Sequence, residues 1–137
     1  MENRRKILIV DDDPVVRKVL STRLTSQRFQ VVEASNGSSG IALAKQEHPD
    51  LILLDVMMPL QDGIQVYAAL KQDSATKEIP IIFLTALSGG LEPFKDLNPK
   101  RSYWMFGKPY QPEELLRAIQ QTLDEPVLEK QQDTGGR

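Results

Sequence analysis

Short apolar runs recur along the chain, and most are continuous rather than alternating with polar residues. They lie at Lys6–Val10, Leu51–Leu54, Ile79–Leu84 and Tyr103–Phe106, with a weaker run at Gln30–Ala34. Continuous Val, Ile and Leu runs of this length are typical of strands that are buried on both faces, as in a parallel sheet covered by helices. The pattern therefore predicts five parallel strands rather than half-exposed antiparallel ones.

Between these runs, apolar residues recur with the spacing of a helix. Helices are predicted from Pro14 to about Arg28, over Ser38–Glu47, from about Ile64 to Gln72, and from Pro112 onward. The side chains expected to face the core are Val16, Val19, Leu20 and Leu24 in the first helix, Ile41, Ala42 and Ala44 in the second, and Leu115, Leu116, Ile119 and Leu123 in the last. Asp13 is expected to cap the first helix, because short acidic side chains are favoured at that position and proline is tolerated after it.

Strands and helices thus alternate, which predicts an α/β fold with a doubly wound parallel sheet and right-handed crossovers. Segment 86–101 contains two glycines and two prolines, so the fourth of the five helices is expected to be short, displaced or irregular. Residues 1–123 are predicted to form one domain. Residues 124–137 are polar and lack periodicity, which predicts a disordered tail or the stub of a linker.

Composition narrows the classes of function. The 137 residues include 17 basic and 19 acidic side chains, one histidine and no cysteine, with a net charge of -2. Cysteine-based zinc sites, iron–sulfur clusters and cysteine nucleophiles are therefore excluded. The balanced charge does not supply the basic face that generic duplex binding uses. The apolar runs are strand-sized and no export signal is recognisable, so we expect a cytoplasmic protein without membrane or direct nucleic-acid contact.

Polar residues closely follow four of the five predicted strands. They are Asp11, Asp12 and Asp13 after the first strand, Asp55 after the third, Thr85 after the fourth and Lys108 after the fifth. A parallel α/β sheet brings the carboxyl ends of its strands to one edge, where ligands bind. Clustered carboxylates without histidine or thiolate form a hard oxygen site that suits Mg²⁺ and leaves positions for phosphate oxygens. Together the set supplies a metal site, a carboxylate nucleophile and two ligands for phosphoryl oxygens.

Each of these residues also has an ordinary structural explanation. Asp13 is better explained as the helix cap than as a ligand, and Asp55 alone could be a turn residue. Threonine at a strand end is usually turn or core, and a lone lysine is usually solvated. Asp11 and Asp12 resist this explanation, because two further carboxylates beside a cap add repulsion without structural gain.

The motifs KILIVDDDP, DLILLDVMMPLQDG, IPIIFLTA and GKPY occur in this order, and they resemble the receiver domain of bacterial two-component response regulators over about residues 4 to 123. The resemblance implies a flavodoxin-like sheet with strand order 2-1-3-4-5. It also implies the site roles: Asp55 as phosphoacceptor and metal ligand, Asp12 as direct Mg²⁺ ligand, Asp11 as its water-linked neighbour, the Met57 carbonyl as third protein ligand, and Thr85 and Lys108 on the phosphoryl oxygens.

The function implied by this resemblance is a signalling switch. A sensor histidine kinase or a phosphotransfer protein would donate a phosphoryl group to Asp55 with Mg²⁺, and the affinity for a downstream protein effector would change. Catalysis would be confined to the domain's own phosphorylation and hydrolysis, so no metabolic enzyme is expected. Nothing foldable is expected after Leu123. The output is therefore expected through protein contacts in trans, unless the chain is an excised piece of a longer protein.

The sequence departs from the family pattern near the predicted switch. The aromatic position three residues before the lysine is Met105, so the switch region, with Trp104 beside it, is expected to be altered. Met57 and Leu87 occupy positions that tune phosphoryl lifetime in the family. Neither side chain can hydrogen-bond an attacking water, which predicts slow self-dephosphorylation.

Three other functions compete with the switch. A receiver-like adaptor that works without phosphorylation is favoured by the altered segment 86–101, but the retained acids argue against it. For an aspartate-nucleophile phosphatase, Asp11 and Asp13 have the required spacing, yet a cap insertion is missing and Asp55 would have no role. A flavodoxin-like electron carrier would need a phosphate-binding loop where this chain has three acids.

Overall fold

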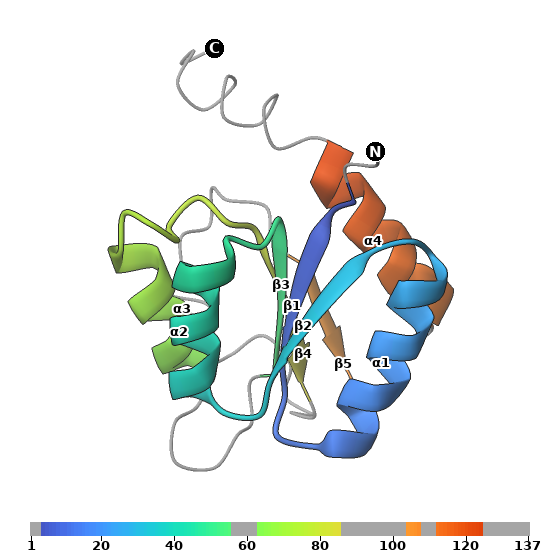
Figure 1. Ribbon diagram of the computed structural model, residues 1–137, viewed down its shortest axis with the longest axis horizontal. Coiled ribbons are helices and arrows are strands. Elements are labelled where there is room, and N and C mark those ends of the chain that lie inside the picture. Colours follow the sequence, from blue (N-terminus) through green and yellow to red (C-terminus); the bar gives the residue numbers. More distant parts are fainter. Residues whose placement is uncertain (1–3, 56–62, 86–103, 108–111, 125–137) are drawn as a thin grey trace.

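A computed structural model of the chain describes residues 4–55, 63–85, 104–107 and 112–124. Its elements are β1 (Lys6–Val10), α1 (Pro14–Ser26), β2 (Gln30–Ala34), α2 (Gly37–Glu47), β3 (Leu51–Asp55), α3 (Gly63–Gln72), β4 (Ile81–Thr85), β5 (Trp104–Gly107) and α4 (Pro112–Asp124). The strands form one parallel sheet in the order β2-β1-β3-β4-β5 (Figure 1). This confirms the predicted sheet and its strand order. The irregular helix expected between β4 and β5 lies outside the described residues.

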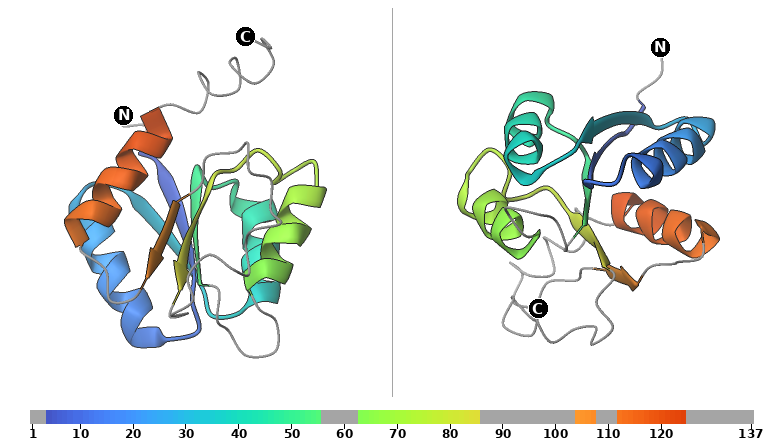
Figure 2. Two further views of the ribbon diagram at one scale, coloured as in Figure 1. Left: turned by 180° about the vertical axis from the view of Figure 1, so that it is seen from behind. Right: turned by 90° about the horizontal axis from the view of Figure 1, so that it is seen from below.

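The sheet separates two hydrophobic clusters, because successive strand residues point to opposite faces. Leu8 and Val10 of β1 pack with α2 and α3 on one face, and Ile7 and Ile9 pack with α1 and α4 on the other. The right panel of Figure 2 shows the sheet between these two helix pairs. The residues of β3 are buried throughout, as the continuous apolar run predicted.

Two helix starts follow from side-chain caps. Asp13 Oδ1 accepts a hydrogen bond from the Val15 N–H at 2.9 Å, so the predicted cap of α1 is confirmed. Asn36 Oδ1 accepts from the Ser39 N–H at 2.8 Å and starts α2 at Gly37, one residue before the prediction.

The start of β4 and the end of α1 also differ slightly from the predictions. β4 begins at Ile81 rather than Ile79, because the Ile79 N–H donates to the Thr76 carbonyl in a turn and Pro80 has no N–H to donate. α1 ends at Ser26 rather than near Arg28, and Arg28 itself has a left-handed φ of 74°.

Two helical side chains predicted to face the core are exposed. Val19 is 53% exposed, because α1 buries the i, i+4 stripe of Leu20 and Leu24 and Val19 lies about 100° from it around the helix. Ala42 is exposed, since α2 buries Gly40 and Ala44 instead. Leu116 is partly buried against the cluster that contains Leu115 and Ile119.

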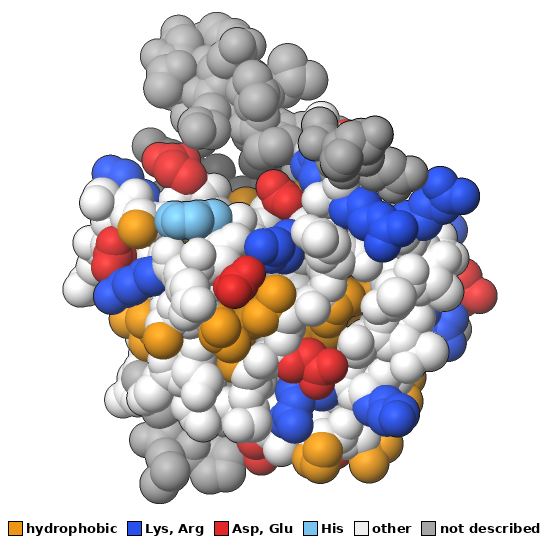
Figure 3. Space-filling view, viewed as in Figure 1, with side chains coloured by type: hydrophobic (Ala, Val, Ile, Leu, Met, Phe, Trp, Pro, Cys, Tyr) orange, Lys and Arg blue, Asp and Glu red, His pale blue; other side chains and the backbone are white. Residues whose placement is uncertain are grey.

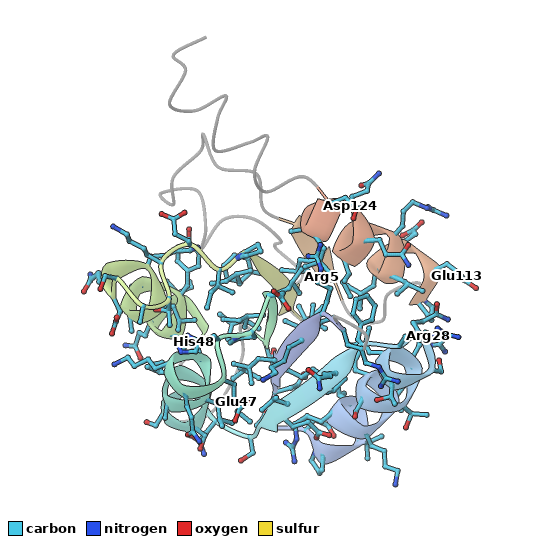
Figure 4. All side chains as sticks on the ribbon, turned by 45° about the horizontal axis from the view of Figure 1, so that its top comes forward. Arg5, Arg28, Glu47, His48, Glu113 and Asp124 are labelled. Carbon is cyan, nitrogen blue, oxygen red and sulfur yellow. The ribbon has the colours of Figure 1, made fainter. Side chains whose placement is uncertain are left out.

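Side chains at the amino ends of the strands also make hydrogen bonds, at the edge of the sheet that Figure 4 turns toward the viewer. Lys6 Nζ donates to the carbonyl of Glu47 at 3.3 Å and to its Oε1 at 2.9 Å. Arg5 Nη1 donates to the Leu123 carbonyl at 3.3 Å, which joins the start of β1 to α4. α4 extends through Asp124, the first residue of the predicted tail, and the rest of that tail lies outside the described residues.

Charge is mixed over the surface. Acidic and basic side chains are interspersed across the face shown in Figure 3. No helix in the described part of the chain is long and apolar enough to cross a membrane.

Candidate functional site

Three aspartates come together where the two central strands β1 and β3 end. Val10 and Leu54 are register partners, so Asp11 directly after β1 and Asp55 at the end of β3 lie side by side. Asp12 follows Asp11 in the turn before α1. This edge of the sheet is viewed in the right panel of Figure 2. Its position at the carboxyl ends of the strands matches the prediction.

The three carboxylates form a compact oxygen cluster. One carboxylate oxygen from each of Asp11, Asp12 and Asp55 lies within 4.8 Å of the other two. Asp11 is 0% and Asp55 2% exposed, whereas Asp12 is exposed to solvent. Buried like charges repel one another unless a cation lies among them, and an all-oxygen donor set with one open side suits Mg²⁺. The residues present therefore fit a magnesium ion.

Asp12 is exposed to solvent, whereas Asp11 is held by hydrogen bonds at three of its atoms. The backbone N–H of Asp11 donates to the Ala34 carbonyl of β2 at 3.1 Å. Its Oδ1 accepts from the Asp13 N–H at 2.9 Å, and its carbonyl accepts from Arg17 Nη1 at 2.7 Å. The turn that carries the acids is thus tied to β2 and to α1.

Asp13 is placed as the sequence predicted, as a cap rather than a ligand. It is exposed, and its Oδ1 accepts from the N–H groups of Val15 and Val16. In the part of the chain that the structure describes, the acidic cluster consists of Asp11, Asp12 and Asp55 without it. The spacing that favoured a phosphatase is therefore explained by helix capping.

The remaining predicted residues are placed in part. Thr85 ends β4, and its Cα is the register partner of Gly107, the last residue of β5. Trp104 and Met105 of the predicted switch region lie in β5 opposite Ile82 and Phe83. The positions of Met57, Leu87 and Lys108 lie outside the described residues.

Two polar residues near the site were not anticipated. Arg17 of α1 reaches the Asp11 carbonyl, and its Nε donates to Glu33 Oε1 of β2 at 3.2 Å. A surface arginine that binds a backbone carbonyl leaves no periodic or motif signal in a single sequence. Only the fold reveals this contact.

Residues 7–120 match the response regulator receiver domain. The chain belongs to this family. It is thus a receiver domain of two-component signalling, as its motifs predicted.

Curated relatives of this receiver domain include proteins described as probable or DNA-binding transcriptional regulators. A probable transcriptional regulator, ycf27, of Cyanophora paradoxa is 37% identical over 92% of this chain and 52% of its own length. RpaA of Synechocystis sp., a DNA-binding dual master transcriptional regulator, is 36% identical over 86% of this chain and 48% of its own length. The chain thus spans about half the length of the curated relatives it matches.

Solved receiver structures share the fold. A CheY-like receiver domain protein from Methanospirillum hungatei is 25% identical with a TM-score of 0.82, covering 93% of this chain and 99% of its own. The receiver domain of a sensor histidine kinase from Pseudomonas aeruginosa is 26% identical with a TM-score of 0.74, covering 89% of this chain and 99% of its own. That structure contains a magnesium ion coordinated in its active-site cleft.

Proposed function

We propose that this receiver is a phosphoacceptor switch that takes a phosphoryl group on Asp55 from a phosphohistidine of a sensor kinase or phosphotransfer protein. The observation that carries the proposal is the buried Asp55 carboxylate, within 4.8 Å of Asp11 and Asp12 at the carboxyl edge of the sheet. A buried cluster of like charges has no structural benefit, and clustered carboxylates of this kind are typical of functional sites.

The proposed step is an in-line phosphoryl transfer. A carboxylate oxygen of Asp55 forms a bond to phosphorus as the N–P bond of the phosphohistidine breaks. The electrons of the broken bond stay on the imidazole nitrogen, and the proton on the ring's other nitrogen lets it leave as neutral imidazole. The product is an aspartyl phosphate, and the reverse path needs no other reactant.

Each site residue has a role in this step. Asp11 and Asp12 hold Mg²⁺ beside Asp55, and the Met57 carbonyl is the expected further ligand. Bound Mg²⁺ supplies positive charge that lowers the repulsion between the carboxylate and the incoming phosphoryl oxygens. The Thr85 hydroxyl and the Lys108 ammonium are proposed to hold the transferred oxygens, supported by the placement of Thr85 at the end of β4.

The proposed output is a change in affinity for a protein partner, and the relatives favour transcription as the process controlled. The domain would act only on itself, without turnover of a separate substrate. Direct DNA contact by these residues is not part of the proposal, since their net charge is -2. A phosphorylation-independent adaptor remains the alternative, but the buried acids disfavour it.

Intact mass after incubation with a small phosphodonor and Mg²⁺ tests the proposal. Wild type should gain a single phosphoryl increment, and the increment should vanish in Asp55→Ala and with EDTA. Asp73→Ala is the matched control, because Asp73 is an acid in the turn after α3 that binds Lys45 rather than the cluster. An increment that persists in Asp55→Ala, or wild type that neither gains mass nor binds Mg²⁺, would sink the proposal in favour of the adaptor.

A further inference from the structure

Arg17 joins three elements around the acidic turn. It lies in the first turn of α1, where its backbone N–H donates to the Asp13 carbonyl at 3.0 Å. Its side chain is 17% exposed, reaches back to the Asp11 carbonyl through Nη1 at 2.7 Å, and reaches across to Glu33 of β2 through Nε. A guanidinium can make both contacts at once, because its donors point in fixed and separate directions.

The shorter of the two Arg17 hydrogen bonds affects the geometry of the acidic cluster. The Asp11 carbonyl belongs to the peptide unit that links Asp11 to Asp12, and a peptide unit is planar. The N–H of Asp11 is already held by Ala34 and its carboxylate by Asp13. The bond from Arg17 holds the plane of the following peptide, which contains the N and Cα atoms of Asp12 and so limits the directions in which its exposed side chain can leave the backbone.

Glu33 completes the arrangement by balancing charge. An unpaired guanidinium next to the cluster would repel a divalent cation. The Glu33 carboxylate, at 3.2 Å from Arg17 Nε, offsets that charge and holds the guanidinium in place.

We propose that Arg17 is a positioning residue for the cation site, and that Glu33 acts through it. Arg17 touches neither the cation nor the phosphoryl group; it aims the Asp12 carboxylate at the position shared with Asp11 and Asp55. The inference rests on the proposed function, because it assigns the support of the same magnesium site.

The sign of the effect separates positioning from simple electrostatics. Arg17→Met removes a positive charge near the cluster and leaves Glu33 unpaired, so charge alone would tighten Mg²⁺ binding. Loss of positioning weakens it instead. Outer-shell partners of metal ligands are typically worth roughly 10- to 100-fold in affinity, so we expect about tenfold weaker binding in Arg17→Met.

Lys6 offers a matched control at the opposite edge of the sheet. Its Nζ also donates to a backbone carbonyl and to a glutamate carboxylate, both of Glu47. The side chains of Lys6 and Glu47 are exposed to a similar degree. Lys6→Met therefore removes the same kind of tie without touching the acidic turn. Its Mg²⁺ affinity should equal that of wild type.

The experiment is isothermal titration of Mg²⁺ into metal-free wild type, Arg17→Met, Arg17→Lys, Lys6→Met, Glu33→Gln and the double variant Arg17→Met/Glu33→Gln. Arg17→Lys should bind Mg²⁺ with intermediate affinity. A lysine ammonium can reach the Asp11 carbonyl, but it lacks the planar set of donors that holds the Arg17 guanidinium between that carbonyl and Glu33. The double variant should bind Mg²⁺ no more tightly than Arg17→Met, since Glu33 positions nothing once Arg17 is replaced and its own negative charge is lost as well. The phosphorylation rate of Arg17→Met should fall at limiting Mg²⁺ and return to the wild-type value at saturation.

The outcomes separate the two proposals. Wild type that binds no Mg²⁺ and takes no phosphoryl group overturns the proposed function. Wild type that binds Mg²⁺ while Arg17→Met binds equally or more tightly overturns only the positioning role. If Arg17→Met does not fold, Arg17→Lys decides, because it keeps the positive charge: unchanged affinity overturns the role, and weakened affinity supports it.

Discussion

Asp12 and Asp13 are neighbours in sequence but have different tasks in the structure. Asp12 contributes an oxygen to the acidic cluster, while Asp13 accepts hydrogen bonds from the first N–H groups of α1. Removal of an exposed ligand changes metal binding, whereas removal of a cap changes stability. The two residues therefore allow a clean separation of chemistry from folding.

Asp12→Ala should lose Mg²⁺ affinity with little change in the free energy of unfolding. Asp13→Ala should lose about 1 kcal/mol of stability, the usual value of an acidic cap, and retain its Mg²⁺ affinity. Titration calorimetry and urea unfolding of both variants measure the two quantities. The assignment is wrong if the two variants exchange these phenotypes.

For single residues, the sequence predicted a position where that position follows directly from the end of a strand. Asp11, Asp12 and Asp55 follow apolar runs, and parallel strands end at one edge, so their meeting was predictable. Arg17 and Glu33 could not be found in the same way. Their contact depends on the packing of α1 beside β2, which no local pattern encodes.

Among the elements, α2 approaches β1 unusually closely at a glycine. A Cβ built on Gly40 would lie 2.9 Å from Val10 Cγ2 and 3.0 Å from its Cγ1. The first distance is shorter than carbon atoms tolerate and the second is tighter than most carbon contacts, so a side chain at this position would push the helix away from the strand.

Gly40→Ala should destabilise the domain by about 1–3 kcal/mol through overpacking, although alanine is the better helix former by about 1 kcal/mol. The double variant Gly40→Ala/Val10→Ala should cost less than the sum of the two single variants, because the second change makes room for the first. Urea unfolding of the four proteins completes the cycle. Additive losses would show that the close approach does not matter.

The turn after α3 predicts a pH effect. The Ala75 N–H and then Lys45 hold the pKa of the Asp73 carboxyl below its usual value. Since the folded pKa is lowered, the stabilisation from Asp73 is present above the unfolded pKa and is lost as pH falls through the folded value. The stability difference between wild type and Asp73→Asn should therefore be constant near neutral pH and shrink below about pH 3.9. A difference that grows in acid would contradict this.

The sequence predicted the type and order of the elements better than it predicted which face of each helix packs against the sheet. Hydrophobic spacing located α1 and α2, but it placed Val19 and Ala42 on the inward faces, where the structure has them exposed. In α2 the inward positions include Gly37 and Gly40, which carry no hydrophobic signal. A helix that packs through glycines conceals its own inner face from a hydrophobicity pattern.

For the whole molecule, the proposed cation links binding to stability. A ligand that binds only the folded state raises the free energy of unfolding by about 2.7 kcal/mol at 100 times its dissociation constant. At that Mg²⁺ concentration the free energy of unfolding of wild type should rise by this amount, whereas that of Asp12→Ala should not. Unfolding curves with Mg²⁺ and with NaCl of equal ionic strength provide the measurement. An equal gain in both proteins would indicate a general salt effect.

The strand order also determines how motion is distributed. Asp55 ends β3, and Asp11 and Asp12 directly follow β1. Within the described residues these two strands each pair with a neighbour on both sides, whereas β2 and β5 each pair with one strand. Edge strands open at lower free energy than central ones, so their amide hydrogens should exchange with solvent first and those of β1 and β3 last. The carboxylates thus lie at the ends of strands that should exchange slowly, while the contacts of the acidic turn with Ala34 and Glu33 make its geometry sensitive to opening of the edge strand β2.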